Sequence, residues 1–342
     1  MGHRLRWSFV PLLLIAAVAA AGDRLAVLEF FGRQGCSICS SAGPALTSLQ
    51  HEMLGRAVLL EYDYDSFPYG RQERFWASGA SATYLPLVMV GSGYRTSSGS
   101  VDFEQVYRSM LDDELARPVR AAVSAYWRRT TSAMRAYVEL TNLGDTDLEI
   151  DKEAVVWLVA YENASVGHST TWVRSTVGGY LPFDLAPNES IDVVLDSPPM
   201  SGVDWERMAA LVMVEDRPRR SGAYDMLQAT EALPAGLTAE PNALEMDRRG
   251  SVSEIVLTGP HVLTWSAVSG VPWIEATPSS GDLPTTVTLT YRPELRPPLE
   301  MEGTVTLSAT GDDMSFETTV IVTVPGSGHR RGARRQGPSL SP

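Results

Sequence analysis

Residues 25–40 read LAVLEFFGRQGCSICS, so a cysteine pair follows closely on a short apolar run. The run Leu25–Phe31 is almost continuously apolar, which is typical of a buried strand. Helical spacing then extends over Cys39–Leu54, where apolar residues recur three or four positions apart. Cys36 and Cys39 are therefore expected to lie between a strand and a helix.

A cysteine at the start of a helix has distinctive chemistry. The unpaired backbone N–H groups and the positive end of the helix dipole stabilise a thiolate, and can lower the pKa of the thiol from ~8.5 to between ~3.5 and ~7.5. Cys36 is therefore expected to be the attacking thiolate, and Cys39 the resolving thiol. The loop between them is very short, so a disulfide there constrains the unfolded chain little and is better suited to redox exchange.

Three further elements follow in the N-terminal region. The stretches Ala57–Tyr64 and Tyr84–Val90 are apolar enough to be buried strands, and Phe103–Leu115 has the spacing of an amphipathic helix that ends before Pro118. The alternation of strands and helices predicts an α/β domain over residues 23–117.

These residues resemble the thioredoxin-like family. A Cys-x-x-Cys pair follows the first strand, and Glu29 stands where that family carries a buried acid. Pro44 lies five residues after Cys39, as in family helices, and Pro86 matches the cis-proline that opens the strand facing the disulfide. Because Glu-Phe-Phe-Gly precedes the cysteines and a β-sandwich is expected after the domain, the chain looks closest to secreted proteins of the Omp28-like type.

The resemblance implies a mechanism. Cys36 would attack a substrate disulfide to form a mixed disulfide, and Cys39 would then release the product. Glu29 would accept the proton from Cys39, because a carboxylate partly buried beneath the motif has a raised pKa. Pro86 would position the substrate backbone. A solvent-facing Glu29 and a purely structural disulfide are the alternatives.

Four residues are candidates for the substrate groove: Gly35, Ser37, Ile38 and Leu85. Gly35 replaces the tryptophan that thioredoxins usually carry, and Leu85 replaces threonine, valine or isoleucine. These departures argue against general protein reduction but leave dithiol chemistry in place.

From Pro118 the pattern changes to short strands of period two, separated by turn residues. Such strands over 118–233 predict an immunoglobulin-like β-sandwich. A second all-β region, 237–325, contains Val271–Gly281 (VPWIEATPSSG), which resembles the signature of bacterial BACON-like β-sandwich modules. These modules are associated with carbohydrate binding or surface display, but Trp273 in the signature is expected to be a core residue. The predicted fold class is thus an N-terminal thioredoxin-like α/β domain followed by two β-sandwiches.

Composition excludes several function classes. The chain has 342 residues with a formal net charge of −13, which argues against a nucleic-acid partner. With only two cysteines it can form neither a multi-disulfide scaffold nor a four-cysteine zinc site. The nearest further metal ligand in the sequence is His51, well down the helix, so neither a metal nor another cofactor is expected.

The two ends of the chain differ in composition from the regions between them. Basic residues, an apolar run and small residues over 1–21 predict a cleaved secretory signal, and hence a secreted or periplasmic protein; an uncleaved membrane anchor is the alternative. Residues 326–342 are rich in Gly, Ser, Pro and Arg, which predicts a disordered basic tail.

Two functional hypotheses follow. In the first, the protein is an exported thiol–disulfide oxidoreductase whose substrates are protein thiols and disulfides, served by a membrane or soluble thiol donor. In the second, it is an adhesion or scaffold protein. Its β-sandwiches would bind a cell-surface glycan or protein, and its first domain would be redox-inactive.

Overall fold

The computed structural model describes residues 23–65, 69–80, 84–219, 222–247, 251–295 and 301–325. The predicted signal at 1–21 and the predicted tail at 326–342 lie outside these residues. The chain divides into two compact units. The described residues of unit 1 lie within 23–124, 140–191 and 202–230, and those of unit 2 lie within 125–139, 192–201 and 231–325.

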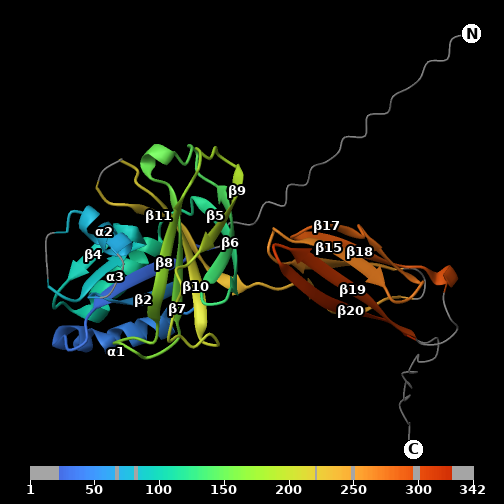
Figure 1. The fold of residues 1–342 in the computed structure, drawn as a ribbon, viewed down its shortest axis with the longest axis horizontal. Helices are drawn as coiled ribbons and strands as arrows, with labels where there is room; N and C mark the ends of the chain where they lie inside the picture. Colours follow the sequence, from blue (N-terminus) through green and yellow to red (C-terminus); the bar gives the residue numbers. More distant parts are fainter. Residues whose placement is uncertain are drawn as a thin grey trace, which may run out of the picture. The chain divides into compact units, whose positions relative to one another are not determined.

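The N-terminal region alternates strands and helices (Figure 1). Its elements are β1 (Ala26–Gly32), α1 (Ser37–Glu52), β2 (Ala57–Asp63), α2 (Tyr69–Ala77), β3 (Leu87–Val90), a 3-10 turn (Gly91–Gly93), β4 (Arg95–Ser98) and α3 (Phe103–Leu115). Strand β1 lies between β2, to which it is parallel, and β3, to which it is antiparallel. Strand β4 pairs with the other edge of β3.

Only strands and a short 3-10 turn (Ile150–Lys152) follow in the described residues of the middle region. The strands are β5 (Ala121–Arg129), β6 (Met134–Asn142), β7 (Val155–Glu162), β8 (Trp172–Tyr180), β9 (Ser190–Asp196), β10 (Met208–Asp216) and β11 (Asp225–Pro234). Strands β7, β8 and β10 form an antiparallel group with β7 in the centre.

The predicted fold class is wrong, because these two regions share one sheet. Its eleven strands run in the order β4-β3-β1-β2-β8-β7-β10-β11-β5-β6-β9. The regions join where Glu61 of β2 pairs in parallel with Trp172 of β8. The part of the chain that the structure describes is mostly β, with 49% strand and 16% helix, and it shows no separate N-terminal α/β thioredoxin domain.

The reason for this merger is the free edge of β2. A strand at the edge of a sheet leaves N–H and C=O groups unpaired, and a further strand can cover them. Strand β8 pairs with this edge at Glu61, and apolar side chains from both regions share one core. Val27, Phe31 and Tyr62 from the N-terminal strands are buried in the same cluster as Trp157 and Met213 from the middle region.

The two faces of β1 pack against different elements, because side chains alternate along a strand. Leu28 and Phe30 lie with Cys39 in a cluster that also contains residues of α1 and α3. Val27 and Phe31 face the other way, into the cluster that contains Phe75 of α2. Burial on both faces explains why β1 is almost wholly apolar.

The C-terminal region consists of two sheets (Figure 1). One has the order β12-β14-β18-β16 and the other β13-β20-β19-β15-β17. The bounds are β12 (Thr238–Glu240), β13 (Ala243–Glu245), β14 (Val252–Thr258), β15 (Thr264–Ser269), β16 (Ile274–Thr277), β17 (Ser280–Asp282), β18 (Thr285–Tyr291), a 3-10 turn (Pro293–Leu295), β19 (Met301–Gly311) and β20 (Met314–Val324).

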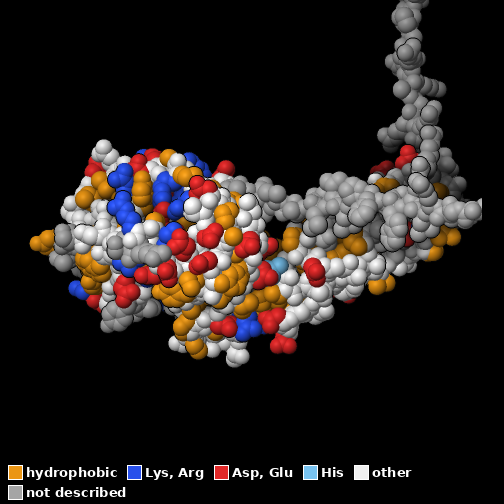
Figure 2. All heavy atoms as spheres, turned by 90° about the horizontal axis from the view of Figure 1, so that it is seen from above, with side chains coloured by type: hydrophobic (Ala, Val, Ile, Leu, Met, Phe, Trp, Pro, Cys, Tyr) orange, Lys and Arg blue, Asp and Glu red, His pale blue; other side chains and the backbone are white. Residues whose placement is uncertain are grey.

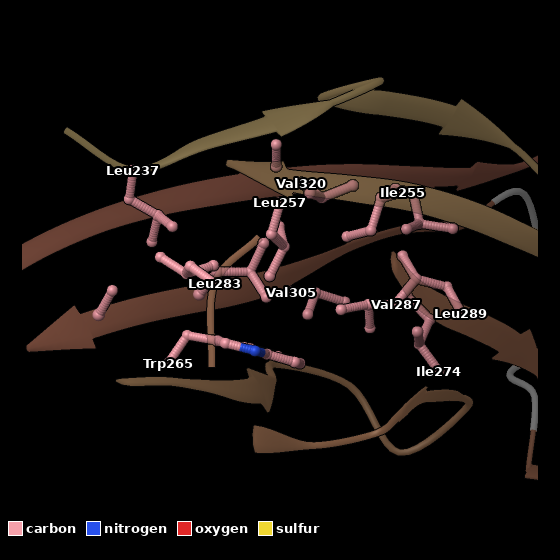
Figure 3. Packing of buried hydrophobic residues seen from close by; sticks show 14 of the residues in the cluster. Leu237, Ile255, Leu257, Trp265, Ile274, Leu283, Val287, Leu289, Val305 and Val320 are labelled. Carbon is pink, nitrogen blue, oxygen red and sulfur yellow. The ribbon is translucent and has the colours of Figure 1, made fainter. Parts of the chain in front are cut away.

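Side chains from both sheets fill a single core between them (Figure 3). Ile255 and Val287 come from one sheet, and Trp265 and Val305 from the other. Trp273 is 2% exposed, which confirms that it is a core residue. Gly303 makes room for it, since a Cβ there would lie 2.8 Å from the indole ring.

On the face shown in Figure 2, Arg and Lys side chains gather next to Asp and Glu side chains. Ion pairs among the described residues include Arg117 with Asp225 and Arg217 with Glu153. Within the described ranges, no helix is long and apolar enough to cross a membrane.

Candidate functional site

Cys36 and Cys39 form a disulfide at the N-terminus of α1. Cys36 is the residue that caps the helix, and its Sγ accepts a hydrogen bond of 3.1 Å from the backbone N–H of Cys39. The two cysteines differ in exposure: Cys36 is half-buried, whereas Cys39 is 0% exposed. A second sulfur can therefore approach only Cys36.

The predicted groove residues of the motif surround Cys36 on its open side. Gly35 and Ser37 are exposed, and Ile38 is 37% exposed. Gly35 has a φ of +79°, a left-handed conformation that favours glycine over the tryptophan of the family pattern. Solvent thus reaches the disulfide beside one apolar side chain and one residue without a side chain.

Leu85 and Pro86 precede β3 next to the end of β1 from which the chain continues to the cysteines. In the register of β1 with β3, Phe31 is opposite Leu87, so Pro86 precedes the pairing where β1 ends and the chain turns towards Cys36. The Leu85–Pro86 peptide bond is cis, as the sequence predicts. Leu85 is half-buried and packs against the cluster that Cys36 also touches.

Glu29 is fully buried, but it does not lie beneath the disulfide. Its carboxylate points to the face of β1 that packs against α2, whereas Cys39 packs against the opposite face. It accepts hydrogen bonds from Tyr62 Oη at 2.6 Å and from Arg71 at 2.8 Å and 2.6 Å. The role of proton acceptor for Cys39 is therefore corrected to that of a partner for Arg71.

Arg71 continues this buried network into the middle region. It donates to Glu215 at 2.8 Å, and Glu215 also accepts from Arg74 and from the indole N–H of Trp157. Burial alone would raise the pKa of Glu215, but the two arginines outweigh it and the pKa is lowered. Burial, reinforced by Glu29, raises the pKa of Tyr62 well above its usual value.

A residue that the sequence did not point to contacts the backbone before Cys36 and a side chain just after Cys39. His168 belongs to the loop between β7 and β8, and it sits over the start of α1. One ring nitrogen, Nδ1, is 3.4 Å from Ser40 Oγ, and the other, Nε2, is 3.3 Å from the carbonyl oxygen of Arg33. The ring also meets Phe30 edge to face, with centroids 6.2 Å apart.

Glu61 of β2 anchors this loop. The carboxylate, 1% exposed, accepts from the backbone N–H of His168 at 2.7 Å and 2.8 Å and from that of Ser169 at 2.6 Å. Gly43 of α1 provides the space, because a Cβ there would lie 2.8 Å from the carbonyl oxygen of His168. The one sequence signal for this docking is Glu61 itself, a carboxylate within an apolar strand that needs a buried partner.

The described residues contain no group of three or more His, Cys, Asp or Glu that could hold a metal ion. His51 is exposed in the last turn of α1. At 1.5 Å per residue it is about 20 Å along the helix from Cys36. The disulfide stands without a metal ligand set in this part of the chain.

Comparison with known proteins finds no matching family model and no matching curated protein. Among solved structures, the chain is similar to a GH5 xyloglucanase of Bacteroides ovatus in complex with a heptasaccharide, with 20% identity, a TM-score of 0.22, and coverage of 26% of this chain and 19% of that chain. A protein of unknown function from Porphyromonas gingivalis W83 matches with 9% identity and a TM-score of 0.22, over 60% of this chain and 99% of that chain. WR4, an MSP family member of C. elegans, matches with 13% identity and a TM-score of 0.21, over 27% of this chain and 99% of that chain.

Proposed function

We propose that the protein is an exported dithiol–disulfide exchange protein that acts on protein thiols and disulfides through Cys36 and Cys39. The observation that supports this most directly is the asymmetry of the pair: Cys36 is half-buried at the helix start, and Cys39 is completely buried. Exchange needs one sulfur that a partner can reach and one that attacks from within.

The exchange conserves electrons and protons. A substrate thiolate attacks Cys36 Sγ of the disulfide, the Cys36–Cys39 bond breaks, and Cys39 leaves as a thiolate that takes up a proton. A second substrate thiolate then attacks the substrate sulfur of the mixed disulfide and releases Cys36 as a thiolate. The substrate has lost two electrons and the protein has gained them, and the reverse sequence reduces a substrate disulfide.

The surroundings of Cys36 support its role as the attacking or leaving sulfur. The N–H of Cys39 donates to Cys36 Sγ, and such a bond, together with the helix dipole, stabilises a thiolate. The exposed side chain of Ile38 offers a partner polypeptide an apolar contact, and Gly35 leaves the approach open. Pro86 at the adjoining sheet edge would lie alongside the bound substrate backbone.

The proposed location is outside the cytoplasm. An oxidised cysteine pair persists in secreted or periplasmic proteins, where the redox environment allows it, and the sequence of residues 1–21 favours export. A thiol or disulfide partner in that compartment, membrane-bound or soluble, would restore the starting state after each exchange.

The reduction potential of Cys36–Cys39 tests the proposal. The protein is equilibrated in graded glutathione buffers, alkylated and weighed by intact mass. We expect reversible exchange, with a potential near about −270 mV for a reductant or near about −120 mV for an oxidant. Cys39→Ser is expected to trap a mixed disulfide on Cys36, and Cys36→Ser to abolish exchange with a substrate protein.

Two results would count against the proposal. One is a pair that stays oxidised across the whole glutathione series while the protein remains folded. The other is a Cys36→Ser variant that exchanges thiols as fast as the matched Cys39→Ser variant. Either result would favour the alternative hypothesis, in which the protein is an adhesion or scaffold protein with a redox-inactive cysteine pair.

A further inference from the structure

His168 contacts the groups that hold Cys36 in place. The carbonyl oxygen of Arg33, which faces Nε2 of His168 at 3.3 Å, also accepts the backbone N–H of Cys36 at 3.2 Å. The hydroxyl of Ser40, which faces Nδ1 at 3.4 Å, donates to the carbonyl oxygen of Cys36 at 3.2 Å. The imidazole thus bridges both ends of the turn that carries Cys36.

The number of protons that these hydrogen bonds require determines the charge of the His168 imidazole. The carbonyl of Arg33 can only accept, so Nε2 must donate to it. Ser40 has one hydroxyl proton, which it gives to the carbonyl of Cys36, so its oxygen can only accept from Nδ1. All three contacts are hydrogen bonds at once only when both ring nitrogens carry protons, and that species is the imidazolium cation.

The surroundings of the ring can accommodate a positive charge. On β2, Glu61 is a carboxylate bound to the backbone N–H of His168, and Asp65 just beyond the strand pairs with the side chain of Arg33 at 2.6 Å. On α1, the first turn has no acidic residue, so the cysteine pair is the group there that can become an anion. The facing atoms of β1 belong to Phe30 and Gly32, which are uncharged.

We propose that His168 is a positioning residue that, as the imidazolium, holds the Cys36 turn and stabilises the Cys36 thiolate. The inference rests on the proposed function and adds its regulation: exchange at Cys36 responds to pH through His168. An imidazolium loses its charge when it loses a proton, so the stabilisation is present while His168 carries both ring protons and is lost when one is removed.

The test compares rates of alkylation of Cys36 across pH 5 to 8.5 in the reduced Cys39→Ser background. His168→Gln removes the charge while keeping a polar side chain, and is expected to slow alkylation by about three- to tenfold at pH 5.5, because a nearby cation favours a thiolate. The ratio of the two rates is expected to approach one at pH 8.5. His168→Lys, which keeps a positive charge, is expected to recover most of the acid-side rate.

His51→Gln is the matched control, because His51 is exposed at the far end of the same helix. A His168→Gln variant that reacts like the parent at every pH, or more slowly by the same factor at every pH, would overturn the inference. The ring N–H signals of His168 in NMR spectra at pH 5.5 provide a second readout that needs no substitution, and one bonded N–H in place of two would contradict the bridge.

These outcomes are distinct from failure of the proposed function. If Cys36–Cys39 does not exchange with glutathione in the unsubstituted protein, the proposed function fails. If the pair exchanges but the pH profile ignores His168, only the regulation by His168 fails.

Discussion

Arg71 has no exposed surface, and its charge is balanced by two carboxylates on different strands. Glu29 comes from β1 and Glu215 from β10, so this side chain joins the N-terminal strands to the middle region. Its guanidinium also lies over the ring of Trp157, 5.0 Å from the centroid. A planar donor with five N–H groups suits such a position better than lysine does.

Arg71→Met is expected to lower the free energy of unfolding by about 3–5 kcal/mol, because it leaves the buried Glu29 without its cation and Glu215 with Arg74 alone. Urea denaturation at pH 7 measures the change. Arg207→Met is the matched control, since Arg207 forms an exposed pair with Asp204 and such pairs contribute about 0–1 kcal/mol. Equal losses for the two variants would show that the buried network does not stabilise the fold.

Asp216 gives the protein a pH-dependent stability. Burial raises the pKa of this carboxyl to about 6, and Oδ1 has no hydrogen-bond partner. Because the unfolded value is ~3.9, the native state binds the proton more tightly between pH ~4 and ~6. The stability contributed by this group is therefore complete below pH ~4 and is lost as the pH rises through about 6.

Asp216→Asn is expected to remove this dependence. Its unfolding free energy, relative to that of the unsubstituted protein, should rise by about 1–3 kcal/mol between pH 3.5 and pH 7.5. Urea denaturation at the two pH values gives the comparison, and Asp145→Asn at an exposed turn serves as control. A constant difference between the two proteins across this range would rule out Asp216 as the source.

At the scale of elements, the β7–β8 loop packs closely against α1 at Gly43. Alanine normally stabilises a helix interior relative to glycine by about 1 kcal/mol. At this position the new Cβ would lie 2.8 Å from the carbonyl oxygen of His168, so the loop must move away.

Gly43→Ala is therefore expected to speed amide hydrogen exchange at Ser169, whose N–H is bound to Glu61, and to destabilise the protein by about 1 kcal/mol or more. Exchange detected by NMR or mass spectrometry measures the effect. Ser41→Ala, exposed on the same helix, is expected to leave Ser169 protected. A Gly43→Ala protein that is more stable and equally protected would contradict this fit.

Individual elements could be predicted because their signals are local. The helix expected over Phe103–Leu115 has those bounds, and the one expected over Cys39–Leu54 forms at Ser37–Glu52. The pairing of Glu61 with Trp172 could not be predicted, because apolar periodicity shows that a strand is buried but not which distant strand covers its edge. The separate-domain prediction failed for this reason.

The candidate site divides in the same way. The cysteine pair and the cis bond before Pro86 could be predicted because each is indicated by a short local pattern in the sequence. The orientation of Glu29 does not, because moving one position along a strand reverses the face. His168 could not be found either, since it is 128 residues from Ser40 in sequence and approaches the start of α1 from the loop that precedes β8.

At the scale of the whole molecule, the cysteine pair and the C-terminal sandwich belong to different cores. Cys39 is buried with residues of β1, α1 and α3, whereas Trp273 is buried with residues 237–324 and Tyr137. Trp273 also packs edge to face on Tyr291, with centroids 5.9 Å apart. Stability and redox behaviour should therefore respond to substitutions independently.

Trp273→Ala is expected to destabilise the C-terminal core by about 3–5 kcal/mol and to leave the reduction potential of Cys36–Cys39 unchanged. Urea denaturation followed by limited proteolysis locates the loss, and glutathione equilibration measures the potential. A shift of the potential in folded protein would show that the two cores are coupled.

The pairing of β2 with β8 also determines the order in which the parts of the candidate site form during folding. The cysteines come early in the chain, whereas His168 follows Arg33 by 135 residues. Pairing so far apart in sequence forms late, because a long loop must close first. Before β8 pairs with β2, an oxidant would react with Cys36 and Cys39 while the contacts of His168 with Arg33 and Ser40 are still missing. A chain truncated between Cys39 and His168 would keep both cysteines but lack the histidine that contacts Arg33 and Ser40.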